Sequence, residues 1–284
     1  MLQAARPRRR SPMVMPTTVH IRRSYTECRF GQLHLATAYP SGGGFDERIP
    51  LICLHPTGSS MNFFAPLLPE LGRDRSVYSF DLPGYGASDA PSTDLSIADL
   101  AGAIDDFMQS LRLRTADVIG VQLGALLAVE LALAKPQQCR KLVLSSVPHF
   151  TPQEMKSQEW HGSPAVAVAD GSHLNKEWQR LVNARSAGVN AEQLTDELAE
   201  SLRSRRRTSA LLHALLEYPT QKKLASLRQP GLILKPNDEF RDHSTRAKSS
   251  YAQSVIEELP ESGTNIFTNN GQRALQLIRQ FLDK

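Results

Sequence analysis

The sequence is poor in cysteine, and the few cysteines that it has lie far apart. Cys28, Cys53 and Cys139 form no C-x-x-C pair within the 284 residues. Disulfide frameworks and structural zinc sites need several cysteines at short and regular spacings. We therefore expect three free thiols in a reducing compartment, no metal site and no cofactor.

Long apolar runs are also missing. No stretch approaches the roughly 20 apolar residues of a membrane span, and no apolar segment follows the N-terminal arginines as a signal peptide requires. These absences predict a cytoplasmic protein that does not have a membrane as a partner.

Aromatic residues are scarce, at 6% of the chain, and the net charge is only +4. Much of this charge comes from two separate short runs, "RPRRR" (6–10) and "RSRRR" (203–207), whereas nucleic-acid binding usually shows a basic face interleaved with aromatics. We expect no nucleic-acid partner, and we interpret residues 1–19 as a disordered basic tail.

Strand and helix patterns alternate in the first half of the chain. Alternating residues on either side of Gly31 predict a β-hairpin, and apolar runs such as "LICLH" (51–55) are typical of parallel strands that are buried on both faces. Helical patterns at 96–113 and 123–134 separate the later strands, with Ser96 as the expected N-cap of the first. This order predicts an α/β fold, with a mostly parallel central sheet and helices on both faces.

The strand pattern stops between residues 150 and 228, and helical patterns replace it before strand "GLILK" (231–235) resumes the sheet. We predict an all-helical cap at 150–228, inserted between two parts of one core at 20–149 and 229–284. The cap should cover the carboxyl edge of the sheet, where open α/β sheets bind ligands. Trp160 and Trp178 are expected to make its underside apolar.

Four motifs in this order resemble the α/β-hydrolase superfamily. They are "LICLHPTGSS" (51–60), "DLPGYGASDAP" (81–91), "IGVQLGALLAVELALAKP" (119–136) and "ELPESGTNIFTNNGQRALQLIRQFL" (258–282). The resemblance implies an α/β-hydrolase fold with a nucleophile elbow, an oxyanion loop and a Ser-Asp-His triad. Independently of the resemblance, Gly120 and Gly124 flank a turn that is too tight for larger side chains.

The triad positions that the resemblance assigns fall on Gln122, Asp238 and Thr264, so only the acid is of the family's residue type. The last histidine of the chain is His243, which leaves none for the C-terminal loop. A neutral amide cannot attack a carbonyl, although it can donate and accept hydrogen bonds. The triad is therefore predicted to be degenerate.

Two groups of site residues follow. The resemblance implies backbone donors at Thr57 and Leu123, and these residues, with Gln122 and Thr264, are the predicted substrate-binding groups. The predicted catalytic groups are Asp238, the acid that the resemblance assigns, and His55 and His149, because a histidine can exchange protons at neutral pH. The alternatives are an exposed loop aspartate for Asp238 and a structural histidine for His55.

Three hypotheses for the function remain at this point. The favoured one is an enzyme that acts on a small, partly apolar carbonyl compound by non-covalent acid/base chemistry: C–C cleavage, decarboxylation, isomerisation, cyclisation or water-mediated hydrolysis. The second is a catalytically inactive relative that binds a small molecule. The third is an esterase with a relocated nucleophile, for which Ser59, Ser60, Ser145 and Ser146 are the candidates.

Overall fold

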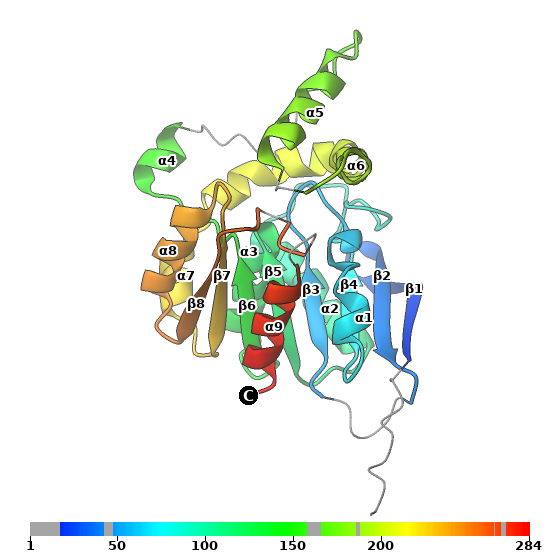
Figure 1. Cartoon of the computed structure of the whole chain (residues 1–284), viewed down its shortest axis with the longest axis vertical. Helices are drawn as coiled ribbons and strands as arrows, with labels where there is room; N and C mark the ends of the chain where they lie inside the picture. Colours follow the sequence, from blue (N-terminus) through cyan, green and yellow to red (C-terminus); the bar gives the residue numbers. More distant parts are fainter. Residues whose placement is uncertain (1–17, 43–47, 158–165, 186–187, 264, 268–270) are drawn as a thin grey trace, which may run out of the picture.

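An eight-stranded sheet runs through the part of the chain that the computed structural model describes, which is residues 18–42, 48–157, 166–185, 188–263, 265–267 and 271–284. Its strand order is β1-β2-β4-β3-β5-β6-β7-β8. Adjacent strands from β4 to β8 pair in parallel, and β2 is antiparallel to both of its neighbours, β1 and β4 (Figure 1). The strands are β1 (Val19–Cys28), β2 (Gly31–Pro40), β3 (Leu51–Leu54), β4 (Val77–Phe80), β5 (Ala116–Val121), β6 (Cys139–Ser145), β7 (Gly231–Pro236) and β8 (Ser254–Leu259).

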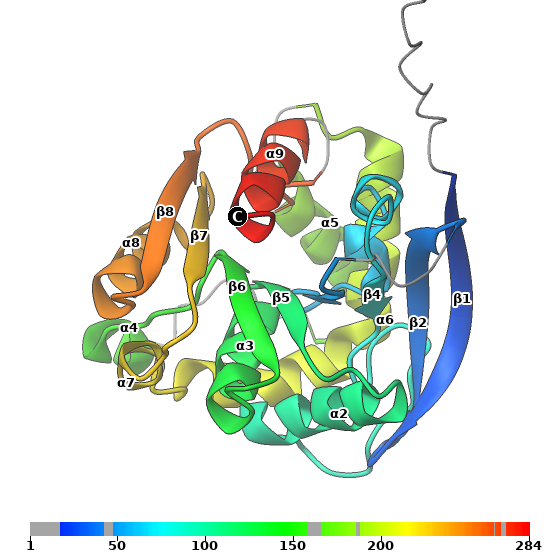
Figure 2. The same ribbon diagram turned by 90° about the horizontal axis from the view of Figure 1, so that it is seen from below.

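Helices cover both faces of this sheet, which confirms the predicted fold class (Figure 2). One face carries α2 (Ile97–Ser110), α3 (Leu123–Ala134), α7 (Thr220–Ala225) and α8 (Arg241–Ser250). The other carries η1 (Met61–Phe64), α1 (Leu68–Leu71) and α9 (Gly271–Leu282). Two apolar clusters form between the sheet and these layers, so β3 and β5 are buried along their whole length, as parallel strands covered on both sides should be.

Helix α2 begins at the predicted N-cap, Ser96. The Ser96 side chain accepts a hydrogen bond from the Asp99 N–H, and the Asp99 carboxylate accepts one from the Ser96 N–H. This reciprocal capping box satisfies two of the N–H groups that a helix start leaves without partners.

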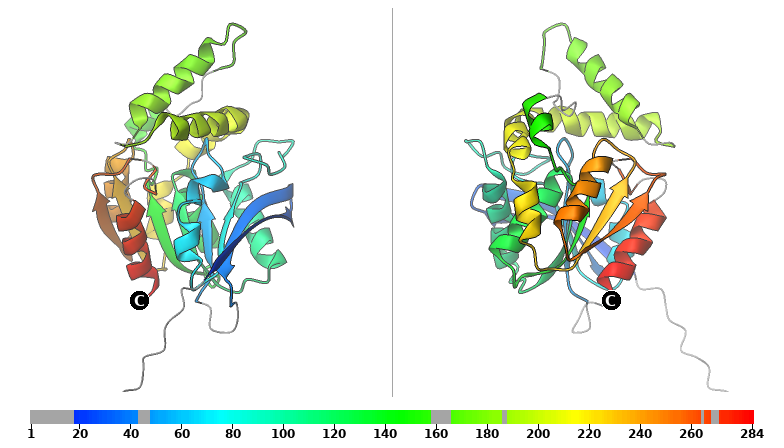
Figure 3. Two further views of the ribbon diagram at one scale, coloured as in Figure 1. Left: turned by 45° about the vertical axis from the view of Figure 1, so that its right-hand side comes forward. Right: turned by 90° about the vertical axis from the view of Figure 1, so that its left-hand side faces the viewer.

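A helical insertion separates β6 from β7. It consists of α4 (Pro152–Ser157), α5 (Ser172–Ala184), α6 (Ala191–Leu216) and α7. Helices α5 and α6 lie beyond the carboxyl ends of the strands, where α6 crosses above the sheet and α5 projects away from it (Figures 1 and 3). Most of the predicted basic tail, residues 1–17, lies outside the described residues.

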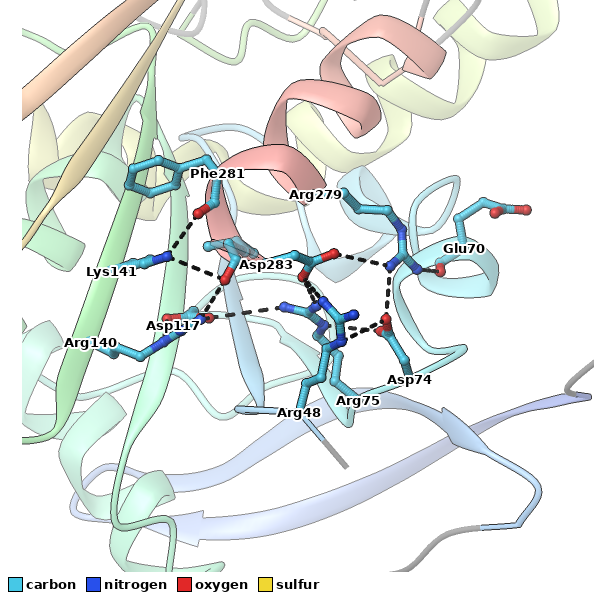
Figure 4. Close-up of polar contacts among 11 residues, drawn as sticks. Arg48, Glu70, Asp74, Arg75, Asp117, Arg140, Lys141, Arg279, Phe281 and Asp283 are labelled. Carbon is cyan, nitrogen blue, oxygen red and sulfur yellow. Dashed lines mark hydrogen bonds and ion pairs between the residues drawn. The ribbon is translucent and has the colours of Figure 1, made fainter. Parts of the chain in front are cut away.

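A network of charged side chains holds α9 at the opposite end of the sheet (Figure 4). Asp117, at the start of β5, is fully buried and accepts hydrogen bonds from the Arg140 guanidinium at 2.9 and 2.6 Å. The buried Arg75 lies 4.0 Å from Asp117 and pairs with Asp283. Arg140 and Lys141 also donate to the last carbonyls of α9, both at 2.8 Å. Cations at a helix C-terminus satisfy its free carbonyls and interact favourably with its dipole.

Candidate active site

Gln122 occupies a strained turn between β5 and α3. Its backbone has φ 52° and ψ −109°, a conformation that non-glycine residues rarely adopt. A Cβ at Gly120 would overlap the Gly124 carbonyl, and one at Gly124 would overlap the Leu54 carbonyl on β3. Both glycines are therefore required for the close approach of α3 to the sheet, and the tight elbow is present with a glutamine at its tip.

The Gln122 side chain binds the loop that follows β3. Its carbonyl Oε1 accepts hydrogen bonds from the Thr57 N–H at 2.9 Å and from the Thr57 hydroxyl at 2.5 Å. Gln122 is only 5% exposed, and its Nε2 amide has no hydrogen-bond partner among the residues that the structure describes. The Thr57 N–H, which was predicted to bind a ligand, thus binds Gln122. The other predicted donor, Leu123, is the first residue of α3, where N–H groups have no partner within the helix.

A cavity of about 620 Å³ lies above Gln122. Its floor is formed by Gln122 and the segment Pro56–Ser60, and its roof by α5 and α6. A volume of several hundred Å³ is typical of small-molecule sites. The structure brings the predicted binding residues Gln122 and Thr57 together in this cavity.

The roof of the cavity is mixed: Leu181, Ala184 and Val189 supply apolar surface, whereas the face of α6 is largely polar. The residues of α6 that line it include Gln193, Asp196, Glu197, Glu200 and Ser201. Their spacing of three and four residues places them on one face of the helix. This periodicity was available in the sequence, but a polar helix face facing a cavity has the same pattern as one facing solvent. Trp178 does not line the cavity, and Trp160 lies outside the described residues.

Two side chains of this polar face have unusual environments. Glu200 accepts a hydrogen bond from the Asn62 side chain at 3.3 Å through Oε1, while its buried Oε2 has no partner among the described residues. Burial raises the pKa of Glu197, and the Asn265 amide that donates to it only partly offsets this. The nearby Arg180 guanidinium also lowers the pKa of Glu197, but less than burial raises it.

His55 is fully buried, and both of its ring nitrogens are engaged. Its Nδ1 donates to the Pro56 carbonyl at 2.8 Å, and its Nε2 accepts from the Leu82 N–H at 3.0 Å. Burial lowers the pKa of His55 and keeps the ring neutral. This geometry corresponds to the structural alternative, because the ring joins the Thr57 loop to the turn after β4 and does not line the cavity.

Asp238, after β7, is half-buried and binds the end of β6. Its Oδ2 accepts from the Ser146 hydroxyl at 2.5 Å, and its Oδ1 accepts from the Phe240 N–H at 2.9 Å. Asp238 and Gln122 are not joined by a hydrogen bond, and Asp238 does not line the cavity. The other predicted residue of the loop after β8, Thr264, lies outside the described residues.

His149 lies against α8 and away from the cavity. Its N–H donates to His243 Nδ1 at 3.1 Å, and its ring Nε2 lies 3.1 Å from the Ser250 hydroxyl. Burial lowers the pKa of His149 and lowers that of His243 to about 4. The structure therefore places this predicted catalytic residue in the packing between α8 and the start of the helical insertion.

We expect acid to destabilise the protein through His243. Its pKa is about 4 in the folded protein and near 6.5 in an unfolded chain, so the unfolded state binds more protons between these values. The stability due to the neutral ring is complete above pH 6.5 and is lost as the pH falls towards 4. Between pH 7 and pH 5 the expected loss is about 2 kcal/mol, measured by urea unfolding. His243→Asn, whose side-chain oxygen can accept the same hydrogen bond, should remove most of this loss, whereas the exposed His213→Gln should not; equal pH dependence in all three proteins would contradict the prediction.

The described residues contain no cluster of histidine, cysteine and carboxylate side chains that could hold a metal ion. All three cysteines are free, as predicted, and Cys53 and Cys139 are buried. No helix within the described part of the chain has the length and apolarity needed to cross a membrane.

The comparisons with known proteins agree on one family. The model of the alpha/beta hydrolase fold family matches residues 49–257. The pimeloyl-[acyl-carrier protein] methyl ester esterase of Shewanella woodyi is 32% identical over 194 residues, which cover 64% of this chain and 72% of the esterase. The 2-hydroxymuconate semialdehyde hydrolase of Pseudomonas sp. is 29% identical over 172 residues, or 57% of this chain. The match spans about half of that hydrolase, at 54% of its length.

The similarity extends to solved structures. The enol-lactonase from Burkholderia xenovorans superimposes with a TM-score of 0.76 at 15% sequence identity, over 92% of this chain and 100% of the lactonase. At this identity the likeness concerns the fold alone.

Proposed function

The chain belongs to the α/β-hydrolase family, and on that premise we propose that it acts on a small carbonyl compound without a serine nucleophile. The observation that carries the proposal is the side chain of Gln122 at the tip of the elbow. Its oxygen is held by Thr57, so its amide nitrogen is the group that it offers to the cavity. An amide N–H donates well to a carbonyl oxygen but cannot attack a carbonyl carbon.

The backbone of Gln122 supports a binding role for its side chain. A non-glycine residue in a sparsely populated conformation costs on the order of 1–3 kcal/mol. Glycine in the same turn would avoid most of that cost. Strain that is kept at the floor of a large cavity is typical of a functional position.

The proton transfer that such a reaction needs is proposed to involve Asp238. The carboxylate lies at the carboxyl edge of the sheet and binds Ser146, whose neighbour Ser145 accepts from the Gln122 N–H at 3.0 Å. His55 and His149 are proposed to act by positioning, because their ring or backbone groups are used in structural hydrogen bonds. The names of the two relatives above, an esterase and a hydrolase, favour hydrolysis by an activated water among the reactions predicted from the sequence.

A second candidate function is binding without turnover. The observation in its favour is that the Gln122 oxygen already occupies the donors of Thr57, which a developing negative charge would otherwise use. A ligand would then be held by Gln122 Nε2 and would leave unchanged.

A screen followed by product analysis separates the two functions. Small esters, lactones, diketones and keto acids are tested for thermal stabilisation, and each compound that binds is incubated with the protein and analysed by mass spectrometry. The proposed enzyme converts at least one compound, and Asp238→Asn slows the conversion at least tenfold. Recovery of every bound compound unchanged would favour the binding function.

We expect that Gln122→Ser does not create an esterase. The new hydroxyl would have no histidine to accept its proton, since His55 donates to the Pro56 carbonyl and the last histidine of the chain is His243. Neither wild type nor the variant should gain the mass of a fluorophosphonate probe, and neither should hydrolyse p-nitrophenyl acetate above the background rate. Stoichiometric labelling of the wild type, at Ser146 for example, would instead support a relocated nucleophile.

A further inference from the structure

We infer that two copies of the chain associate through strand β1, with the two strands paired antiparallel across a two-fold axis. Strand β1 forms one edge of the sheet, and no described element lies on its outer side (Figures 1 and 2). It is ten residues long, and most of its residues are exposed. An open edge strand of this length is a template for pairing with another chain. The association does not depend on the ligand of the cavity.

The hydrogen bonds of β2 show which backbone groups of β1 face the free edge. The N–H and carbonyl groups of Gln32 and His34 bind residues of the segment 81–89, on the side of β2 away from β1, at 2.8 to 2.9 Å. These two residues therefore form non-hydrogen-bonded pairs with their β1 partners, Glu27 and Tyr25. Because the two kinds of pair alternate along an antiparallel ladder, every second residue of β1 directs its N–H and carbonyl to the free edge.

The side chains of the same residues carry complementary charges. Every second side chain of a strand points to the same face of the sheet, and on this face Arg23, Tyr25 and Glu27 follow one another. A two-fold axis at Tyr25 places Arg23 of each copy opposite Glu27 of the other, and it places the two Tyr25 rings opposite each other. Pairs of opposite charge and pairs of aromatic rings stabilise such directly opposed positions.

The groups that would form these pairs are available. Arg23 is exposed and makes no ion pair among the residues that the structure describes. Glu27 accepts a hydrogen bond from the Gln32 amide at 2.9 Å through Oε1, which leaves its Oε2 for a guanidinium group. Tyr25 is 55% exposed, although its ring packs against that of His34.

Other pairings of the sheet edges are less complementary. An axis at Arg23 would place two arginines opposite each other, which is destabilising, and an axis at Ser24 would leave Arg23 without a carboxylate opposite it. The other edge of the sheet, β8, has only six residues and carries Glu257 and Glu258. Two copies of β8 would bring four carboxylates together, so β8 follows the usual rule that charges discourage edge pairing, whereas β1 does not.

Sedimentation velocity of the full chain, over a wide range of concentrations, tests this inference. A contact through one strand is small, so we expect a reversible dimer. Glu27→Arg opposes arginine to arginine, and Arg23→Glu opposes carboxylate to carboxylate, so each variant should weaken dimerisation at least tenfold. Combining Arg23→Glu with Glu27→Arg restores the opposite charges, and the dissociation constant should return to within about threefold of wild type.

A matched variant and a second measurement locate the contact. Glu217→Arg makes the same change of charge at the end of α6, where the side chain is 67% exposed, and it should leave dimerisation unchanged. Unchanged thermal midpoints will show that the variants are folded. Hydrogen exchange, compared at high and low protein concentration, should show added protection of β1 at high concentration and none of β8.

Several outcomes would overturn the inference. They are a monomer at every concentration, a dimer that neither single variant weakens, and protection of β8 together with β1, which would indicate that unlike edges pair. Protection of β1 that does not depend on concentration would show that the edge is covered within one chain. Failure of the combined variant to regain dimerisation would overturn the pairing centred on Tyr25.

Discussion

Replacing Asp117 by alanine is expected to destabilise the protein by about 3–5 kcal/mol, the range found when one partner of a buried ion pair is removed. Asp117 is inaccessible to solvent and is the direct partner of Arg140. Arg75, with a side chain that is only 1% exposed, depends on the same carboxylate 4.0 Å away. Without Asp117, Arg75 keeps only its contacts with Asp74 and Asp283, and Arg140 is no longer held against the end of α9.

The expected destabilisation by Asp117→Ala does not require that the Asp117–Arg140 ion pair itself favours folding. Burial raises the pKa of Asp117 despite the nearby guanidinium groups, which shows how much desolvation the carboxylate suffers. The instability of the variant comes from the Arg75 and Arg140 guanidinium groups, which both lose a buried carboxylate partner. Replacing all the charged side chains of this network by well-packed apolar ones would destabilise the protein much less.

Asp106→Ala is the matched control. Asp106 makes a similar two-point contact with Arg29, at 2.7 and 2.8 Å, but the Arg29 side chain is 47% exposed. An exposed pair contributes only about 0–1 kcal/mol. Urea unfolding of both variants measures the difference, and equal destabilisation would show that burial does not govern the Asp117 network.

Replacing Gly124 by alanine is expected to cost about 3 kcal/mol and to abolish ligand binding. The new Cβ would overlap the carbonyl of Leu54, which is a backbone atom in the middle of the sheet. No rotamer change relieves such a clash, so α3 must move away from β3. Gln122 precedes α3 directly, and the movement would separate its oxygen from Thr57.

Two measurements check the Gly124 prediction. Urea unfolding gives the stability, and titration with a compound that binds in the thermal-stabilisation screen gives the affinity. Gly42→Ala provides the control, because a Cβ at this turn meets no atom within 4 Å and should change stability by less than about 0.5 kcal/mol. An unaltered affinity in a folded Gly124→Ala protein would mean that the elbow does not position Gln122.

The positions of the histidines show where reasoning from the sequence succeeded and where it failed. The absence of a histidine after His243 is a property of the chain and needs no structure. The sequence also placed His55 and His149 correctly, after a strand end and near the insertion. It could not reveal their partners, since Leu82 and Ser250 are 27 and 101 residues away from them.

Helix α6 shows the same limit for charged residues. The sequence predicted a helix and an insertion, and both are present. It gave no reason to select Glu200 among the many acidic residues of the chain. A carboxylate becomes distinctive when the packing of its helix removes it from water without supplying a donor, and that depends on the position of Asn62, 138 residues earlier.

The sequence by itself determined the order of strands and helices, the tight glycine elbow and the glutamine at its tip, because periodicity and backbone sterics act over a few neighbouring residues. Only the tertiary structure decided that Thr57 binds the Gln122 oxygen, that both ring nitrogens of His55 have hydrogen-bond partners and that α6 turns its acidic face towards a cavity. These features depend on contacts between segments distant in the chain, where burial changes the energy of a polar group that local sequence leaves unspecified.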